Sequence, residues 1–392
     1  MHAAAPSSAA EALSGLGAFD YQPRTRLVFG PDAIERVGEL ARDLGGRRAL
    51  LVTDRGIVAA GHAGRAVGFI AAAGLQVEVF DQVHENPTTR DVARCVEAAR
   101  KADADLLIGL GGGSSMDTAK GSNFLLSNGG EMKDYWGVGK AAKPMLPLIA
   151  IPTTAGTGSE CQCAALIADE VTHQKMACLD VKALPRIAIL DPLLTLSQPA
   201  GVTACTGVDA LAHALETAVT RKRTALSAAF SREAFCHCIA ALPRVLAAPD
   251  DLKARASMQL GAAFSGMAIE NSMLGAAHAA ANPLTAHHGI VHGHAVGMML
   301  PGIVRFNAGL PEARAHYEEL ASAAGFASVE ILIERLGEIL DLAKMRKPLS
   351  AFGVERAGIP ALAAEAAKQW TATFNPRAIG AADFERLYEE LL

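Results

Sequence analysis

The sequence predicts two domains, an N-terminal α/β domain built on a parallel sheet and an all-helical C-terminal domain. Short apolar runs alternate with helical stretches in the first half, whereas long alanine- and leucine-rich segments with helical periodicity fill the second. A chain of 392 residues is also too long for one core of ordinary size. We expect a loose tail over residues 1–17, the α/β domain over 18–195 and the helical domain over 196–392.

Each predicted strand is a short run of apolar residues, and helical stretches such as 33–44 separate the runs. The runs cover residues 49–52, 76–80, 106–110, 148–151 and 187–190. This alternation is typical of parallel βαβ units. Residues 197–201 then predict the entry into the helical half.

Three glycines, Gly111, Gly112 and Gly113, directly follow the third of these runs. Glycines permit a tight turn whose backbone amides can approach a pyrophosphate, and Ser114 and Ser115 fall where a helix would begin. The pattern is neither a GxGxxG fingerprint nor a Walker motif. From the residues alone, an anion site and a plain strand-to-helix turn both remain open.

A second loop, residues 152–160, follows the fourth run and is dense in hydroxyls and glycine. Hydroxyls and exposed amides can hold the phosphate, ribose or amide groups of a nucleotide. A solvated Ser/Thr/Gly loop is the alternative interpretation.

Asp209 and His213 are four residues apart in a segment of helical periodicity, so both side chains are expected on one helix face. Two further histidines, His278 and His292, follow fourteen residues apart, and small residues precede the first. One carboxylate and three imidazoles form a mixed oxygen and nitrogen donor set, which suits iron(II), zinc, nickel or cobalt better than calcium or magnesium. Taken singly, any of these histidines is more often an ordinary residue than a ligand.

Composition excludes several other functions. A net charge of −5 and the lack of a basic stripe argue against a nucleic-acid partner, and no apolar stretch reaches the length of a membrane span. Seven scattered cysteines do not form a disulfide framework, so we expect a cytoplasmic protein. The pairs Cys161/Cys163 and Cys236/Cys238 lack the spacing of a zinc module, although the first directly follows the second loop.

The chain resembles the iron-dependent, or group III, alcohol dehydrogenases. The resemblance rests on GGGSSMDTAK at 111–120, PTTAGTGSE at 152–160, the Asp-Pro at 191–192, GVDALAHALE at 207–216 and the two later histidines. It spans roughly residues 20–310 and thins out beyond them. It implies a Rossmann-like nucleotide-binding domain followed by a helical domain, as in dehydroquinate synthase, and a homodimer or higher homo-oligomer.

The resemblance also assigns residues. It implies that Asp209, His213, His278 and His292 bind one divalent metal, with Fe²⁺ favoured and Zn²⁺ possible. It implies a cofactor site formed by Asp54, Asn86, Gly111, Gly112, Gly113, Ser114, Ser115, Asp117, Thr153, Thr154, Thr157, Ser159 and Lys175. Asp54 ends the first buried strand, where a carboxylate accepts bonds from a ribose 2′-hydroxyl and repels a 2′-phosphate, so NAD is favoured over NADP.

The resemblance therefore implies an oxidoreductase that transfers hydride between nicotinamide C4 and a metal-bound alcohol or carbonyl. Because the predicted metal ligands lie in the second half and the nucleotide loops in the first, we expect the reaction in a cleft between them. The substrate is expected to be a small alcohol or aldehyde.

Two departures from the family pattern lie near the expected chemistry. Asn282 stands where many members carry a further histidine, and an amide cannot shuttle a proton, so we expect the proton to leave through water, a ribose hydroxyl, or a nearby imidazole such as His287 or His288. His288 is also the alternative metal ligand to His292. Cys161, Gln162 and Cys163 follow the second loop and are expected to line the substrate pocket, where Gln162 replaces a smaller residue.

Two rival functions remain open at this point. A dehydroquinate-synthase-like cyclase or lyase uses the same architecture, but it needs lysines and arginines around a sugar phosphate, and residues 271–293 contain neither. A non-catalytic nucleotide-binding protein has no need for four separated ligands and two ordered loops.

Overall fold

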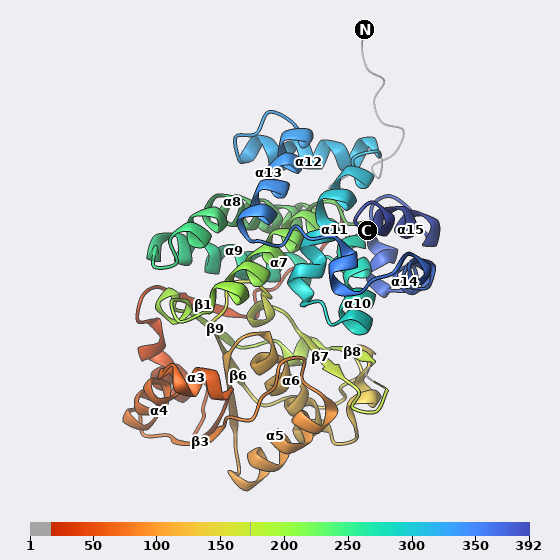
Figure 1. Cartoon of the computed structure of the whole chain (residues 1–392). Helices are drawn as coiled ribbons and strands as arrows, with labels where there is room; N and C mark the ends of the chain where they lie inside the picture. Colours follow the sequence, from red (N-terminus) through yellow and green to blue (C-terminus); the bar gives the residue numbers. More distant parts are fainter. Residues whose placement is uncertain (1–16, 173) are drawn as a thin grey trace. The chain divides into compact units, whose positions relative to one another are not determined.

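The computed structural model describes residues 17–172 and 174–392, so the predicted tail over 1–17 lies almost wholly outside the described residues. The chain divides into two compact units. The first, which we call the strand unit, comprises residues 23–206 and 244–266; the second, the helical unit, comprises 207–243 and 267–392 together with the described residues 17–22. Figure 1 shows the elements of both and labels many of them.

Nine strands are described, and all belong to the strand unit. Six form a parallel sheet in the order β1-β9-β6-β4-β2-β3. Their bounds are β1 Arg26–Phe29, β2 Arg48–Val52, β3 Gln76–Phe80, β4 Leu106–Gly111, β6 Leu148–Pro152 and β9 Ile187–Leu190. The five predicted strands are therefore confirmed, and β1 is an additional edge strand.

Helices cover both faces of this sheet. Along β2, Leu51 packs with α2 (Val37–Asp43) and α4 (His62–Ala72), whereas Leu50 and Val52 pack with α5 (Thr89–Lys101) and α6 (Gly113–Asn128). Successive residues point to opposite faces because a strand has a period of two, and both faces are apolar because both are covered. The predicted helix over 33–44 begins with a 3₁₀ turn, Ala33–Arg36, before α2.

The strand order reverses between β2 and β4, because the chain passes from β2 outward to β3 and then returns beside β2. In open α/β sheets, ligands bind outside the carboxyl ends of the strands at such a switch point. Asp54 follows β2, and the triple-glycine turn starts with Gly111, the last residue of β4, so both lie at the switch point.

A second, three-stranded sheet was not predicted. It has the order β5-β8-β7, with β5 Gly137–Val138, β7 Ala164–Ala168 and β8 Lys175–Leu179, and β7 and β8 are antiparallel. The remaining α-helix described before residue 195 is α3 Arg55–Ala59.

After residue 195 the described chain is helical, as predicted. The helices are α7 Ala200–Val219, α8 Ala225–Ala247, α9 Leu252–Glu270, α10 Ala276–His288, α11 His292–Asn307, α12 Pro311–Ala323, α13 Val329–Leu342, α14 Ile359–Ala366 and α15 Ala381–Glu389. The unit boundaries at 206/207, 243/244 and 266/267 fall within α7, α8 and α9, and the predicted domain boundary at residue 195 stays a prediction. None of the helices in the described part of the chain could span a membrane.

Candidate metal and nucleotide sites

Helix α7 carries Asp209 and His213 one turn apart on the same face, as the four-residue spacing predicts. His213 Nε2 lies 3.5 Å from Asp209 Oδ1, and both side chains are buried. The helix extends through this pair because it contains neither proline nor a break in its alanine- and leucine-rich sequence.

Two other helices bring the remaining imidazoles to the same carboxylate oxygen. His278 lies in the first turn of α10, and its Nε2 is 3.3 Å from Asp209 Oδ1; His292 is the first residue of α11, and its Nε2 is 4.0 Å from that oxygen. The rings of His213 and His278 stack with centroids 4.9 Å apart. The three predicted histidine ligands therefore converge on Asp209 Oδ1.

The spacing of these atoms fits a metal ion. Ligands about 2.1 Å from a tetrahedral ion lie about 3.4 Å from one another. Asp209 Oδ1 and His278 Nε2, which lie 3.3 Å apart, are buried and have no hydrogen-bond partner among the described residues, so both are available to a metal ion. Asp209, His278 and His292 each offer a donor atom within 4.8 Å of the others. Neither His213 nor His288, the alternative ligand, is in this group, although His213 Nε2 lies 3.5 Å from Asp209 Oδ1.

The charges of the cluster also favour a cation. Burial opposes ionisation of Asp209, yet the three imidazoles hold the pKa of its carboxyl far below the ordinary value. Burial likewise opposes a charge on His278, but the carboxylates of Glu216 and Asp209 raise its pKa to about 10. An anionic oxygen that attracts protons onto its neighbours attracts a divalent ion in the same place.

Glu216 is a site residue that the sequence reasoning missed. It lies on α7, seven residues after Asp209, and is buried. Its Oε2 is 2.5 Å from His278 Nδ1, and its Oε1 accepts a hydrogen bond from the backbone N–H of Ala277 at 2.6 Å. The available signal was a single carboxylate in an apolar stretch of helix, at helical spacing from both Asp209 and His213.

The triple-glycine turn has the geometry of a close backbone approach. Gly111 has a φ of 147°, which only glycine adopts readily, and a Cβ there would lie 2.4 Å from Ser115 Oγ. Gly113 begins α6, so the first turn of this helix offers unpaired N–H groups. A Cβ on Gly111 would also lie 3.5 Å from Asp54 Oδ2, which places the predicted ribose-binding carboxylate beside the turn.

The second loop lies against the first. The N–H of Thr153 donates to Gly111 O at 2.9 Å, and the side chain of Thr157 abuts Gly113. Ser115 Oγ and Thr154 Oγ1 are buried hydroxyls without a hydrogen-bond partner among the described residues, and both flank the glycine turn. Such unsatisfied donors fit a phosphate or ribose oxygen.

A buried ion network holds the two loops together. Lys120 Nζ on α6 donates to Ser159 O at 2.6 Å and to Ser159 Oγ at 2.8 Å, and Ser159 Oγ donates to Asp117 Oδ1 at 2.9 Å. Asp117 and Ser159, predicted to touch cofactor, thus contact each other. Burial raises the pKa of the neighbouring Glu160 to about 7.

The other predicted cofactor residues lie farther out. Ser114 is in the first turn of α6 and is half-buried. Asn86 is exposed with a left-handed φ of 53°. Lys175 is exposed at the start of β8. Burial raises the pKa of Asp117, and the charges of Lys120 and Lys175 oppose this shift.

The residues expected to line the substrate pocket follow the second loop. Cys161 and Cys163 are buried, and Gln162 Nε2 donates to Thr157 O at 2.8 Å. The side-chain amide of Gln162 therefore stabilises the preceding loop, residues 152–160, by a hydrogen bond to its backbone. Contact of these three residues with substrate stays a prediction.

Asn282 and His288 occupy α10 beyond His278. Asn282 Nδ2 donates to Gln369 Oε1 at 3.0 Å, and His288 is half-buried in the last turn of the helix. The neighbouring His287 is bonded through Nε2 to Glu365 Oε2 at 2.6 Å. A proton relay through this segment is untested.

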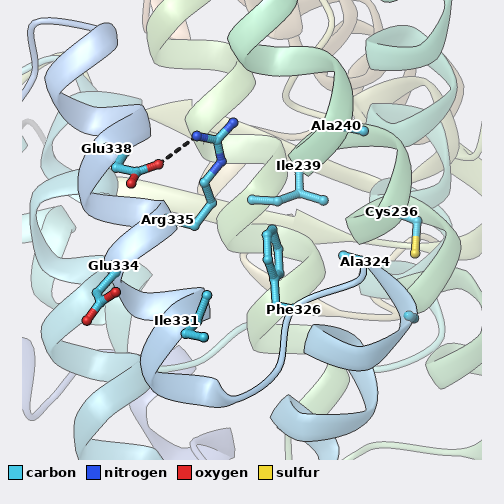
Figure 2. Close-up of a pocket in the computed structure, with 10 residues that line it drawn as sticks. Cys236, Ile239, Ala240, Ala324, Phe326, Ile331, Glu334, Arg335 and Glu338 are labelled. Atoms are coloured by element: carbon cyan, nitrogen blue, oxygen red, sulfur yellow. Dashed lines mark hydrogen bonds and ion pairs between the residues drawn. The ribbon is translucent and has the colours of Figure 1, made fainter.

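A pocket of about 600 Å³ lies elsewhere in the helical unit (Figure 2). Ile239 of α8 and Phe326 line it, and the guanidinium of Arg335 is paired with Glu338 at 2.7 Å. None of the residues predicted to bind metal or nucleotide lines this pocket. It is therefore separate from the candidate metal site.

Comparison with known proteins identifies the family. A family model described as iron-containing alcohol dehydrogenase matches residues 23–192, and one described as the C-terminal part of the Fe-containing alcohol dehydrogenase family matches residues 203–392. The chain belongs to the iron-containing alcohol dehydrogenase family. The resemblance seen in the sequence is thereby confirmed, and it extends to residue 392 instead of thinning out near residue 310.

Relatives in this family cover nearly the whole chain. An NAD-dependent methanol dehydrogenase of Bacillus methanolicus is 32% identical, with 93% of this chain and 97% of that protein aligned. A 1,3-propanediol dehydrogenase of Citrobacter freundii is 33% identical over 92% of this chain and 95% of its own length. The solved structure of a 1,3-propanediol oxidoreductase superposes with a TM-score of 0.91 at 31% identity, covering 96% of this chain and all of that one.

This iron-containing alcohol dehydrogenase family member is an NAD-linked, metal-dependent alcohol dehydrogenase or aldehyde reductase. The family match favours this activity over the cyclase and over a non-catalytic nucleotide-binding protein. It also agrees with the predicted Rossmann-like and helical fold.

Proposed function

We propose that Asp209, His213, His278 and His292 hold the catalytic metal of an NAD-linked alcohol dehydrogenase. The convergence of three imidazoles on the buried Asp209 Oδ1 carries this proposal. Iron(II) is favoured by the family, and zinc suits the same donor set.

The nucleotide is proposed to bind at the carboxyl ends of β2, β4 and β6. Gly111, Gly112 and Gly113, with Ser114 and Ser115, take the pyrophosphate at the N-terminus of α6. Asp54 accepts the ribose hydroxyls, which favours NAD over NADP. The further contacts are proposed for Asn86, Asp117, Thr153, Thr154, Thr157, Ser159 and Lys175.

When bound, the metal and NAD supply Lewis acidity toward the alcohol or carbonyl oxygen and a hydride acceptor or donor. The residues of the chain position and desolvate these groups. Asp209 is anionic and buried, so it offsets the charge of a divalent ion at low dielectric. The Nδ2 of Asn282 donates to Gln369, and an amide does not titrate. His288 is therefore a better proton acceptor than Asn282.

The substrate is proposed to be a small primary alcohol or its aldehyde, since the names of two relatives specify methanol and 1,3-propanediol. Cys161, Gln162 and Cys163 are proposed to line its pocket. We also propose a cytoplasmic homo-oligomer. The buried free thiols of Cys95, Cys178 and Cys238, whose pKa burial raises to about 12, suit a reducing compartment.

The test is metal removal and replacement. Protein stripped with a chelator and reloaded anaerobically with Fe²⁺, or separately with Zn²⁺, is assayed by NADH absorbance against a panel of aldehydes and alcohols, with NAD and NADP compared. Activity should disappear on stripping and return with metal. Carbonyl reduction that survives chelation would contradict the proposal.

A further inference from the structure

Glu216 bonds the ring of His278 on the side away from the proposed metal site. One ring nitrogen, Nε2, lies 3.3 Å from Asp209 Oδ1, and the other, Nδ1, lies 2.5 Å from Glu216 Oε2. Both side chains are buried, so water does not compete for this bond.

The carboxylate of Glu216 is itself fixed in place. Its other oxygen, Oε1, accepts the N–H of Ala277 in the first turn of α10, one residue before His278. Gly275 leaves room for it, because a Cβ there would lie 3.2 Å from Glu216 Oε1 and 3.2 Å from Asn375 Oδ1. Glu216 therefore bonds both the backbone of the first turn of α10 and the His278 ring on that turn.

When the His278 ring is neutral, as in a metal ligand, its bond to Glu216 determines which nitrogen carries the single proton. A carboxylate accepts but does not donate, so the bond to Glu216 requires a proton on His278 Nδ1. The lone pair of the neutral ring is then on Nε2, which faces Asp209. Histidine binds a metal through an unprotonated nitrogen, and an outer carboxylate that fixes the other nitrogen strengthens the ligand.

We propose that Glu216 is a positioning residue that holds His278 in the Nδ1–H tautomer and so sets the metal affinity of the site. This inference rests on the proposed metal site and adds a residue to it. Glu216 touches neither metal nor substrate in this role.

The test compares two matched substitutions. Glu216→Gln has almost the same shape, but its amide N–H₂ donates to His278 Nδ1 whenever its oxygen keeps the bond to Ala277, which forces the wrong tautomer. Glu365→Gln is the control, because Glu365 bonds His287 on the same helix through the same kind of contact but lies outside the proposed ligand set. Metal affinity is measured by competition with a chromogenic chelator, and melting of each metal-free protein is recorded alongside.

Glu216→Gln should weaken Zn²⁺ binding by about 10- to 100-fold, whereas Glu365→Gln should leave it unchanged. An affinity of Glu216→Gln within threefold of the wild type (roughly 0.7 kcal/mol) would overturn the proposal, even if the metal-free protein melts earlier, because that result indicates a structural role only.

A measurement on the wild type decides the question if Glu216→Gln fails to fold. In Zn²⁺-loaded protein labelled with ¹⁵N-histidine, the His278 ring should carry its proton on Nδ1, and a proton on Nε2 would refute the role of Glu216. If the wild-type protein binds no metal at all, the proposed function fails first, and this inference fails with it.

Discussion

Gly111 is the position at which the nucleotide turn is most sensitive to a single added methyl group. Its φ of 147° is strained for any residue with a side chain, at a cost of about 1–3 kcal/mol. An alanine Cβ would also lie 2.4 Å from Ser115 Oγ and 3.0 Å from Ser115 Cβ. Overpacking of this kind costs about a further 1–3 kcal/mol.

Gly111→Ala should therefore lower the free energy of unfolding by at least about 2 kcal/mol, a large part of the typical total of about 5–15 kcal/mol. Gly112→Ala is the matched control, since Gly112 has a φ of −80° and its Cβ would meet Thr154 Cγ2 at 3.4 Å, an ordinary contact. Its cost should stay below about 1 kcal/mol.

The assay is urea unfolding of the metal-loaded protein, followed by circular dichroism, together with NADH titration by fluorescence. Gly111→Ala should lower the urea midpoint and weaken NADH binding. Adding Ser115→Ala should recover part of the stability, because it removes Ser115 Oγ, the atom nearest to the new Cβ. Equal midpoints for Gly111→Ala and Gly112→Ala would show that the turn does not constrain the backbone as described.

Three further predictions concern the strand unit. Burial raises the pKa of Glu160 from 4.5 to about 7, so as pH rises this carboxyl loses its proton in the unfolded state before it does in the folded state. The free energy of unfolding should therefore fall by about 3 kcal/mol between pH ~4.5 and ~7. Glu160→Gln should make the urea midpoint less dependent on pH across that range. Gln162→Val removes the bond to Thr157 O and should weaken NADH binding about 2- to 10-fold, with metal affinity unchanged. Asp54→Ser keeps a cap for the N–H of Ile57 but removes the charge, and it should raise the NADPH-to-NADH ratio of kcat/KM at least about tenfold.

The sequence reveals features that depend on local spacing. The four central strands β2, β4, β6 and β9 contain continuous apolar runs because both faces of the sheet are covered. Asp209 and His213 are recognisable because four residues make about one helical turn. Strand β1 was not predicted because only Val28 of its four residues is buried, so its sequence lacks a distinct apolar run. The strands β7 and β8 are short and only partly buried, so their pattern is weak.

Features that depend on tertiary contacts could not be predicted from the sequence. Glu216 meets His278 across 62 residues of chain, and Asn282 meets Gln369 across 87. Neither pair has a spacing rule, because packing of separate helices creates the contact. The family resemblance identified candidate ligands and loops, but the hydrogen bonds among Asp117, Lys120 and Ser159 became visible only in the fold.

Metal content per chain tests the central claim most directly. Wild-type protein, Asp209→Ala, His278→Ala and the control His287→Ala are loaded anaerobically with Fe²⁺, desalted and analysed by elemental mass spectrometry. His287 is on the same helix as His278, but its side chain is 54% exposed and bonds only Glu365 among the contacts described. The wild type and His287→Ala should retain about one ion per chain, and the other two variants should retain little. Wild-type metal content in Asp209→Ala and His278→Ala would contradict the proposed site.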